Sequence, residues 1–414
     1  MSDNLIKQIR TMDVRYKLEG QDGSDAIHKD PVYSYAVTLL ELGDGEYGTG
    51  LSYSLGRGSE VVVKAIEAFA SFVVGQNLEA IMSDFARFWR SLADESQLRW
   101  IGPHKGAVHL ALASVSSALI DAWARKQGKP LWKLLLEMPP AELIKWVDLK
   151  YLSDFITREE ALELLGADRE SNPYQQEVLE KGYPAYDTSV GWLGHSLEEV
   201  TKRSKATVAA GFRGLKLKVG SPNLEDDLKR IQTVREAVGP DVDIMTDANQ
   251  CWSVTEAIRA GKALAELGCY WLEEPTHPDD ILGYQRIAKE ATPIKLASGE
   301  CVSNAVLFKN LIQSGGLHFL QADVLRLGGL PEWLSVALMA KKAGLPVVPH
   351  AADMGQIHQH LVIWNSVYLG RKPCYVEAIQ HLKEKFTNPA NIQQGRYQLP
   401  DAPGASTRLV ECQP

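Results

Sequence analysis

The chain has 414 residues, of which 45% are hydrophobic and 23% charged, a composition typical of a globular protein with one or two domains. Its formal net charge is −8 and its sequence contains no dense block of lysine and arginine, which argues against nucleic acid as a partner. The sequence shows neither a signal-peptide core nor about 18 consecutive apolar residues, so we expect no secretion and no membrane partner.

The five cysteines are scattered and form no CxxC pair. This pattern favours free thiols in a reducing compartment, and we expect a cytoplasmic protein. Cys251 and Cys301 lie close to acidic residues discussed below, but neither is accompanied by a paired histidine and an oxyanion motif. We therefore interpret both as small packing residues rather than catalytic thiols.

The first part of the chain predicts an α+β domain over residues 1–140. Residues up to about 60 are typical of strands and turns, with a β-rich run at 33–42 followed by a hairpin signal. Residues 25–31 are polar and turn-prone, which predicts a mobile loop. From residue 59 to about 136, apolar residues recur at helical spacing.

The second part alternates regularly between short strands and helices. Residues 141–184 are charged and polar, and predict a linker with one or two short helices and the start of a barrel domain. The strand candidates are 185–189, 214–219, 242–247, 270–274, 294–300, 319–324 and 346–350, with 375–379 as a weaker eighth. This alternation predicts an α/β fold of the TIM-barrel type over residues 185–385, and we expect residues 386–414 to pack back on the first domain or the barrel.

Three acidic residues are spaced almost evenly along this second part. Asp247, Glu273 and Glu300 are separated by 26 residues (273 − 247) and 27 residues (300 − 273), about one strand, one helix and two loops. Residues at the carboxyl ends of successive barrel strands point into one mouth. Three converging carboxylates would repel one another without a cation, so the spacing predicts a site for Mg²⁺, one ion per subunit.

Lys216 and Lys218 are two residues apart on a predicted strand and so share one face. Lysines are rare on the inner wall of a barrel, because burying an unpaired charge is costly. Either lysine alone could be a structural ion-pair residue. As a pair, one ammonium is expected to lower the pKa of the other and help to make an amine base.

Asp323 and His350 form a second candidate acid/base unit. Each ends a strand candidate, and the strands are successive. A carboxylate that holds one imidazole nitrogen fixes the tautomer and raises the basicity of the other nitrogen. The histidine and the lysines would then approach the mouth from opposite sides.

Several other polar residues lie near these positions in the sequence. Asn249, just after Asp247, is predicted to contact substrate, and so is Glu377 on the weak eighth strand. Glu274 would point to the opposite face of a continuing strand, which favours a helix-start or ion-pair role. His358 and His360 are expected to be helix-surface or packing residues rather than metal ligands.

The motifs KLKVG, TDANQCW, WLEEP and SGE, with the Asp323–His350 pair, resemble the mandelate-racemase-like branch of the enolase superfamily. The resemblance covers most of the chain. It implies that the N-terminal α+β domain, with the last stretch of the chain, caps a modified (β/α)₇β barrel. It also implies that Asp247, Glu273 and Glu300 bind Mg²⁺ and that Lys218 and His350 are the acid/base catalysts.

Segments outside the catalytic motifs narrow the resemblance to L-fuconate dehydratase and its relatives. These segments are GSDA followed by DPVYS, GLSYSLGRGSEV, RWIGPHKG, KPLWKLL and GYPAYDTSVGWLG. From this resemblance we expect Asp25 and His28 to bind substrate, together with Asn249 and Glu377. The sequence departs from the group just after His350, where PHAADMGQIHQHL replaces a longer glycine-rich loop.

The resemblance implies an acid-sugar dehydratase of the lyase class that acts on a small carboxylate substrate. Lys218 would remove the proton α to the carboxylate, Lys216 and the metal would stabilise the enediolate, and His350 would protonate the departing 3-hydroxyl. The alternatives are a racemase or epimerase that uses the same lysine and histidine, and a non-catalytic relative. The family commonly forms homo-oligomers, and we expect one here.

Overall fold

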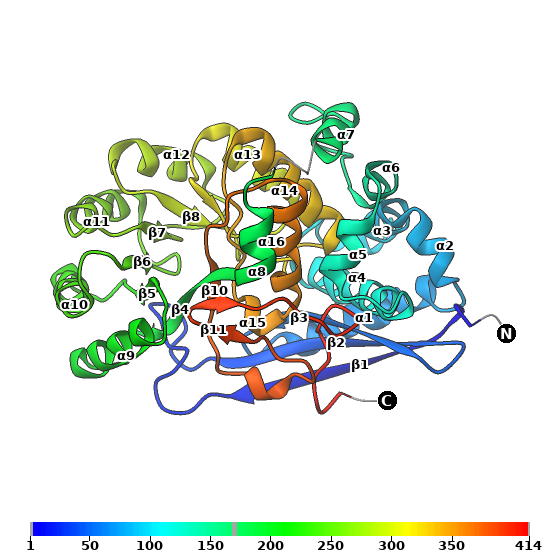
Figure 1. Ribbon diagram of the computed structural model, residues 1–414, viewed down its shortest axis with the longest axis horizontal. Coiled ribbons are helices and arrows are strands. Elements are labelled where there is room, and N and C mark those ends of the chain that lie inside the picture. The colour runs from blue at the N-terminus through cyan, green and yellow to red at the C-terminus, as the bar shows by residue number, and fades with distance from the viewer. Residues whose placement is uncertain (1–2, 168–171, 413–414) are drawn as a thin grey trace.

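The computed structural model describes residues 3–167 and 172–412. Figure 1 shows a barrel of strands ringed by helices on one side and an antiparallel sheet with its own helices on the other. Part of the predicted linker, residues 168–171, and both chain ends lie outside the described residues. The predicted fold class, a modified (β/α)₇β barrel with an α+β cap, is confirmed, whereas the exact domain boundaries stay predictions.

The cap begins with a three-stranded antiparallel sheet in the order β1-β2-β3. Its strands are β1 (Ile6–Lys17), β2 (Val32–Leu42) and β3 (Tyr47–Ser54). The hairpin between β2 and β3 lies at the predicted position, and the loop between β1 and β2 contains residues 25–31. That loop extends towards the barrel and contributes to the site described below.

Helices cover one face of the cap sheet, as the spacing of apolar residues predicts. Those against the strands are α1 (Ser59–Val73) and α4 (Gly106–Lys126), and α2 (Leu78–Ser83), α3 (Phe85–Ala93) and α5 (Leu131–Glu137) pack on α4, with a short 3₁₀ helix at Leu98–Ile101. Two glycines of β3 allow α4 to approach closely. A Cβ at Gly50 would lie 1.8 Å from the Ser114 carbonyl oxygen, and one at Gly48 would lie 2.1 Å from that of Ala118.

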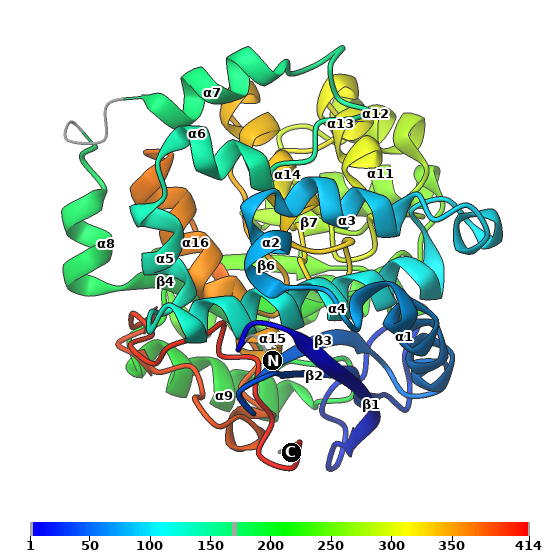
Figure 2. The ribbon, with the colours of Figure 1, turned by 90° about the vertical axis from the view of Figure 1, so that its right-hand side faces the viewer.

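Helix α4 has the length and composition of a membrane span, with a mean hydropathy of 1.4. However, 78% of its most apolar window is buried inside the structure. It lies between the cap sheet and the barrel (Figure 2), so its apolar surface is accounted for by packing as a core helix.

Between the cap and the barrel the predicted linker forms short helices: α6 (Pro140–Leu143), a 3₁₀ turn (Ile144–Trp146), α7 (Arg158–Gly166) and α8 (Gln175–Lys181). The barrel strands then follow in parallel order: β4 (Tyr183–Gly191), β5 (Gly214–Lys218), β6 (Asp243–Asp247), β7 (Trp271–Glu273), β8 (Leu296–Ser298) and β9 (Phe319–Leu320). Strand β10 (Val376–Ala378) pairs in parallel with β4, on the side of β4 away from β5.

Helices on the outside connect these strands: α9 (Leu197–Ala209), α10 (Leu224–Val238), α11 (Val254–Glu266), α12 (Ile281–Glu290), α13 (Ala305–Ser314) and α14 (Leu330–Ala343). Local sequence explains their bounds. Ser253 caps the N-terminus of α11 in a capping box with Glu256, and Asn304 caps α13. Gly315 and Gly344 end α13 and α14 in the left-handed conformation.

Three predicted strands are much shorter than expected, the first being 294–300, of which β8 contains only Leu296–Ser298. Strand β9 ends at Leu320 rather than 324, and the predicted strand 346–350 contributes only a bridge between Val347 and Leu320. The strand stops because the chain turns at Asp323, whose Oδ1 accepts the Leu325 N–H at 2.8 Å. The carbonyl oxygen of Asp323 also accepts the N–H groups of Arg326 and Leu327.

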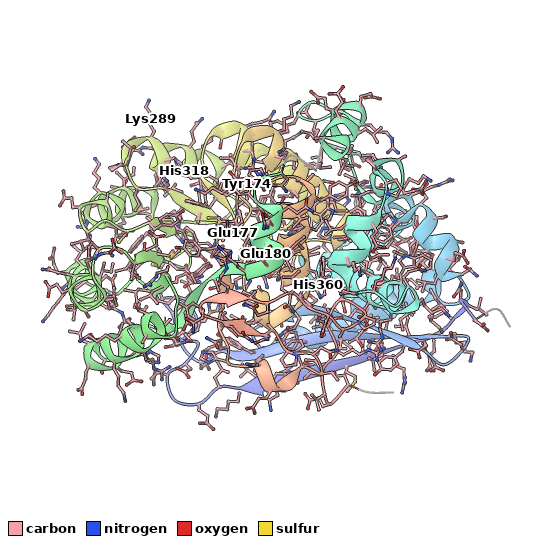
Figure 3. All side chains as sticks on the ribbon, in the orientation of Figure 1. Tyr174, Glu177, Glu180, Lys289, His318 and His360 are labelled. Atoms are coloured by element: carbon pink, nitrogen blue, oxygen red, sulfur yellow. The ribbon has the colours of Figure 1, made fainter. Side chains whose placement is uncertain are left out.

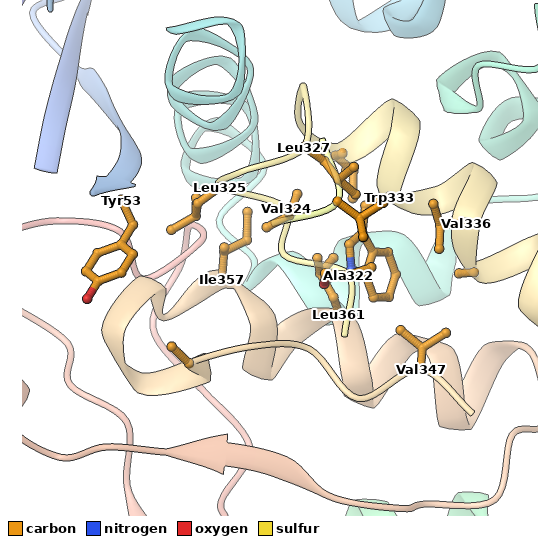
Figure 4. Close-up of a cluster of buried hydrophobic side chains, with 14 of the residues drawn as sticks. Tyr53, Ala322, Val324, Leu325, Leu327, Trp333, Val336, Val347, Ile357 and Leu361 are labelled. Carbon is orange, nitrogen blue, oxygen red and sulfur yellow. Dashed lines mark hydrogen bonds between the residues drawn. The ribbon is translucent and has the colours of Figure 1, made fainter. Parts of the chain in front are cut away.

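After residues 346–350, the seventh predicted strand, the chain forms α15 (Ala352–Gly355) and α16 (Ile357–Tyr368). A hydrophobic cluster, drawn in Figure 4, joins this region to the rest of the core. Leu325 and Trp333 from the barrel meet Ile357 and Leu361 of α16, with Tyr53 of the cap at one edge. The cap and the barrel therefore share one continuous core.

The C-terminal segment packs on both parts. After a 3₁₀ turn (Lys383–Lys385), the strands β11 (Ile392–Gln393) and β12 (Arg396–Tyr397) form a small hairpin that pairs antiparallel with β4. Further on, the Ala405 N–H donates to Asp121 of α4, and the Thr407 hydroxyl donates to the Thr49 carbonyl oxygen of β3.

His360 on α16 fastens this segment and provides a test of the fold. It is fully buried; its Nδ1 accepts the Trp132 N–H at 3.3 Å and its Nε2 lies 3.0 Å from the Ser406 hydroxyl. Burial lowers the pKa of His360 to about 3. The native state therefore holds it neutral, whereas the unfolded chain binds a proton below about pH 6.5.

We expect stability to be lost as the pH falls from about 6.5 towards 3, with His360 contributing about 1.4 kcal/mol per pH unit. A His360→Asn variant should unfold with a shallower pH dependence, measured by denaturant midpoints between about pH 7 and about pH 4. The exposed His277, changed to asparagine, is the control. Parallel pH profiles for the wild type and His360→Asn would contradict the prediction.

Candidate active site

The three evenly spaced carboxylates meet at the carboxyl ends of the barrel strands. Asp247 ends β6, Glu273 ends β7 and Glu300 follows β8 by two residues. One oxygen from each lies within 4.8 Å of the others, a spacing that one cation could bridge. Asp247 and Glu273 are fully buried.

Strand register explains why these side chains converge. In the parallel pairs, Lys218 lies beside Asp247 and Asp247 lies beside Glu273. Alternate residues of a strand share one face, so Lys216 points inward one layer below Lys218. The carboxylates and lysines therefore form two adjacent layers at one end of the barrel.

Both lysines are buried and paired with these acids. The Lys216 Nζ lies 2.8 Å from Glu273 Oε1 and 2.6 Å from Glu377 Oε1, and the Lys218 Nζ lies 2.5 Å from Asp247 Oδ2. The Lys216 ammonium also lies 5.5 Å from the centre of the Tyr186 ring, and that of Lys218 lies 5.4 Å from Trp192. Lys216 thus lies deep in the barrel and Lys218 at the cavity described below.

The expected lowering of a lysine pKa is wrong for this structure. Burial and the Lys216 charge do act to lower the pKa of Lys218, but the contact with Asp247 outweighs them and raises it. The pKa of Lys216 is also raised, because attraction to Glu273 and Glu377 outweighs burial. The sequence suggested the neighbouring ammonium, but not how close the carboxylates lie to both amines.

Glu377 on β10 completes the lysine layer. Its Oε1 accepts the Thr188 hydroxyl at 2.5 Å, and its Oε2 accepts the Ala351 N–H at 2.8 Å. Attraction to Lys216 lowers the pKa of Glu377 despite its burial. Glu377 therefore faces the barrel mouth as a carboxylate, close to both catalytic candidates.

His350 and Asp323 lie in direct contact, as predicted. The His350 Nδ1 donates to Asp323 Oδ2 at 2.8 Å, and its Nε2 lies 3.2 Å from Glu300 Oε2. Burial alone would lower the pKa of His350, but Glu300 and Asp323 raise it to about 9. Asp323 thus fixes the ring with Nε2 directed towards the carboxylates.

His358 also lies next to Asp323, which the sequence did not indicate. Its Nε2 accepts the Val324 N–H at 3.0 Å and lies 3.0 Å from Asp323 Oδ1. Although burial acts to raise the pKa of Asp323, its two histidine neighbours lower it. His358 and His360 were expected to be helix-surface or packing residues. Both are buried, so the surface position is wrong for both, and the packing role fits His360.

A small cavity of about 90 Å³ lies above these groups. Lys218, Asn249, Glu300, His350 and Glu377 line it from the barrel side. Asp25, His28, Tyr33 and Tyr53 line it from the cap side, so the predicted substrate contacts share one space with Lys218 and His350.

The cap loop is held in place by its own polar groups. Asp25 Oδ1 accepts the N–H groups of Ile27 and His28, and Oδ2 lies 2.9 Å from His28 Nδ1. Ser24 accepts the Gly194 N–H through its hydroxyl at 3.3 Å, which joins the loop to the barrel. Asp25 and His28 therefore depend on this cap–barrel contact for their position.

Glu274 does not have the predicted role. Its φ of 40° turns the chain out of the strand, so its side chain is buried on the side of Glu300 and Cys301 instead of starting a helix. Its carboxylate accepts the Gln250 side-chain N–H at 2.8 Å and forms no ion pair among the residues that the structure describes. Asn249, with φ 43°, donates its backbone N–H to Asp247 Oδ1 at 2.9 Å.

Two further residues at the cavity were not found from the sequence. Arg326 donates from Nε to the Glu300 carbonyl oxygen at 2.6 Å and from a terminal nitrogen to the Tyr53 carbonyl oxygen at 3.1 Å. A lone arginine in the apolar run ADVLRLGG was the available signal. Trp192 is part of the GYPAYDTSVGWLG segment, but nothing in the sequence indicates that its ring lies against the Lys218 ammonium.

The balance of charge fits a divalent cation. Asp247, Glu273 and Glu300 come together with Glu274 and Glu377, opposite two lysines and an imidazole. Burial and the Asp247 charge raise the pKa of Glu273, which shows that the nearby lysine does not fully compensate these acids. Carboxylate oxygens are the ligands that Mg²⁺ prefers, and a cation would remove the repulsion.

Comparisons with known proteins identify relatives of the whole chain. A family model described as enolase C-terminal domain-like matches residues 199–412. The chain is 44% identical to mitochondrial enolase superfamily member 1 of Xenopus laevis, over 98% of this chain and 93% of that protein. It is 39% identical to L-galactonate dehydratase of Hypocrea jecorina, over 99% and 93%.

Two solved structures are similar along nearly the whole chain. The crystal structure of human mitochondrial enolase superfamily member 1 has a TM-score of 0.95 and 42% identity, covering 99% of this chain and 95% of that one. L-talarate/galactarate dehydratase from Salmonella typhimurium LT2, liganded with Mg and L-lyxarohydroxamate, has a TM-score of 0.78 and 26% identity, covering 98% and 91%.

Proposed function

The chain belongs to the enolase superfamily, and from its site we propose that it is a Mg²⁺-dependent acid-sugar dehydratase. One observation carries the proposal. A three-carboxylate group is flanked by Lys218 on one side and by the Asp323-supported His350 on the other, at one small cavity between barrel and cap. Dehydratases among its relatives, such as that of Hypocrea jecorina, give additional support.

Asp247, Glu273 and Glu300 are the residues that would hold the cation, one per subunit. When bound, Mg²⁺ supplies the positive charge that anchors a substrate carboxylate and stabilises the negative charge that develops on it. The ion pair of Lys216 with Glu273 and Glu377 keeps a second positive charge fixed in the layer below. That charge favours the enediolate over the less negatively charged substrate carboxylate.

Lys218 and His350 are proposed to move the two protons. With a cation on Asp247 to weaken the contact that holds its own proton, Lys218 would take the proton from the carbon α to the carboxylate, which leaves the enediolate. His350 would give its Nε2 proton to the 3-hydroxyl as the C3–O bond breaks, so that water departs. The resulting enol then tautomerises to a 2-keto-3-deoxy acid.

We propose L-fuconate or a sugar acid of the same configuration as substrate. L-fuconate differs from L-galactonate only in lacking the 6-hydroxyl. Both acids would therefore present the same groups at C2 and C3, where the reaction takes place. The short loop after His350 is fixed by Asp353, whose carboxylate accepts the Ile379 N–H at 2.9 Å. Comparing kcat/KM for the two acids tests this substrate assignment, and no turnover of either would refute it.

Asp323 is proposed to act through His350, and Asp323→Asn tests this role. The asparagine amide fills the same space as the Asp323 carboxylate but has no negative charge to stabilise the protonated His350 ring. We therefore expect kcat to fall by about 10²- to 10⁴-fold. KM should change much less, because Asp323 does not line the cavity. A loss confined to KM, or an unchanged kcat, would contradict the positioning role.

A further inference from the structure

A second and larger cavity lies at the opposite end of the barrel from the candidate active site. Its volume is about 810 Å³, within the range of small-molecule sites. Residues just before the strands line it, among them Arg213 before β5, Lys295 before β8 and His318 before β9, which is labelled in Figure 3. We call it the basal cavity; Arg371, Lys372 and Tyr375 complete the residues used below.

The basal cavity is strongly basic although the chain as a whole is acidic. Its lining includes Arg213, Lys295, Arg371, Lys372 and Arg396, and no aspartate or glutamate among the described residues. Arg396 pairs with Glu177 at 2.9 Å. The other four cations form no ion pair with any carboxylate that the structure describes.

Neighbouring groups respond to this uncompensated charge. Burial and the charge of Arg371 lower the pKa of Lys341. Burial and the charge of Lys295 likewise lower the pKa of His318. Within the part of the chain that the structure describes, the half-buried Arg371 side chain donates only to the Leu345 carbonyl oxygen, at 2.8 Å. The cations therefore line open space without a described acid to pair with, which favours an anion in that space.

The floor of the cavity is apolar and aromatic. Tyr270, Phe319 and Tyr375 pack edge to face or tilted, with ring centres 5.4 Å apart for Tyr270 and Phe319 and 6.0 Å for Tyr270 and Tyr375. Lys295 lies within 5.8 Å of the centres of the Tyr270 and Phe319 rings. A bound molecule would thus meet aromatic rings together with the Lys295 ammonium beside them, and the other cations around the cavity.

We propose that the basal cavity binds a small phosphorylated molecule that also carries a ring. Guanidinium groups pair with phosphate oxygens in a bidentate manner, and four unpaired cations suit two or three negative charges. The ring would lie on the aromatic floor. The site is separate from the carboxylate-lined cavity at the other end of the barrel, so its ligand is neither the substrate nor the metal.

Calorimetric titration with ADP, in the presence of EDTA to keep divalent cations away, tests the proposal. We expect saturable binding of one ADP per chain, with inorganic triphosphate and adenosine each at least about tenfold weaker. A double variant, Arg213→Glu with Lys372→Glu, should weaken ADP binding by at least about tenfold. Neither of these exposed side chains makes a described contact, so the fold should persist.

The matched control is Lys133→Glu with Lys262→Glu, which changes the net charge equally at exposed lysines elsewhere. It should bind ADP as the wild type does, and so should Lys218→Ala, which alters the other end of the barrel. Equal weakening in both double variants would show a net-charge effect and overturn the proposal. Triphosphate binding as tightly as ADP, or no saturable binding, would overturn it as well.

Discussion

Replacing Lys218 with alanine should lower kcat for dehydration by at least about 10³-fold, the usual contribution of a positioned acid/base group. His350→Asn should cause a loss of similar size, because its Nε2 is the proton donor that reaches the cavity from the opposite side. The two variants should nevertheless differ in one partial reaction. In D₂O, His350→Asn should still exchange the proton α to the substrate carboxylate, whereas Lys218→Ala should not.

The difference follows from the order of the steps. Lys218 removes the α proton before the 3-hydroxyl leaves. A variant that lacks only the acid, His350, can therefore still form the enediolate and return it to substrate. NMR of the recovered substrate measures the exchange. Lys262→Ala, at an exposed lysine on α11, should keep full activity. Exchange in Lys218→Ala but not in His350→Asn would reverse the two roles, and unchanged kcat in both would refute them.

Removing the metal should abolish activity completely, and Mg²⁺ should restore it. The structure also predicts an effect on stability, because Asp247, Glu273 and Glu300 repel one another when no cation lies between them. A cation that binds only the folded chain at about 100 times its Kd should stabilise it by about 2.7 kcal/mol. Thermal unfolding with and without Mg²⁺ measures this.

Asp247→Asn provides the matched variant for that measurement. The amide is close in size but brings no negative charge, so the variant should show little stabilisation by Mg²⁺ and no restored activity. Asp279→Asn, at an exposed acid that pairs with Lys105, should respond to Mg²⁺ as the wild type does. Equal stabilisation of Asp247→Asn and the wild type would place the cation elsewhere.

Much of this site could be predicted from the sequence because it follows a repeat. Each β/α unit returns the chain to the same end of the barrel, so the intervals between Asp247, Glu273 and Glu300 were enough to bring them together. The same reasoning paired His350 with Asp323, and two-residue periodicity placed Lys216 and Lys218 on one face. These inferences depend only on regular geometry.

The errors and omissions occur where regular geometry ends. Glu274 follows a strand residue, but its left-handed φ turns it to a side that strand alternation does not predict. His358 reaches Asp323 only because α16 packs against the loop after β9. Likewise, the pKa of Lys218 depends on its distance from Asp247, which spacing along the chain does not set.

The most direct measurement is a product assay with Mg²⁺ and a library of sugar acids that includes L-fuconate and L-galactonate. Semicarbazide absorbance reports 2-keto products, and NMR identifies them. We predict that at least one of these two acids yields its 2-keto-3-deoxy product, and that Lys218→Ala yields none. Inversion at C2 without any keto product would instead indicate an epimerase, and no turnover of any sugar acid would contradict the dehydratase assignment.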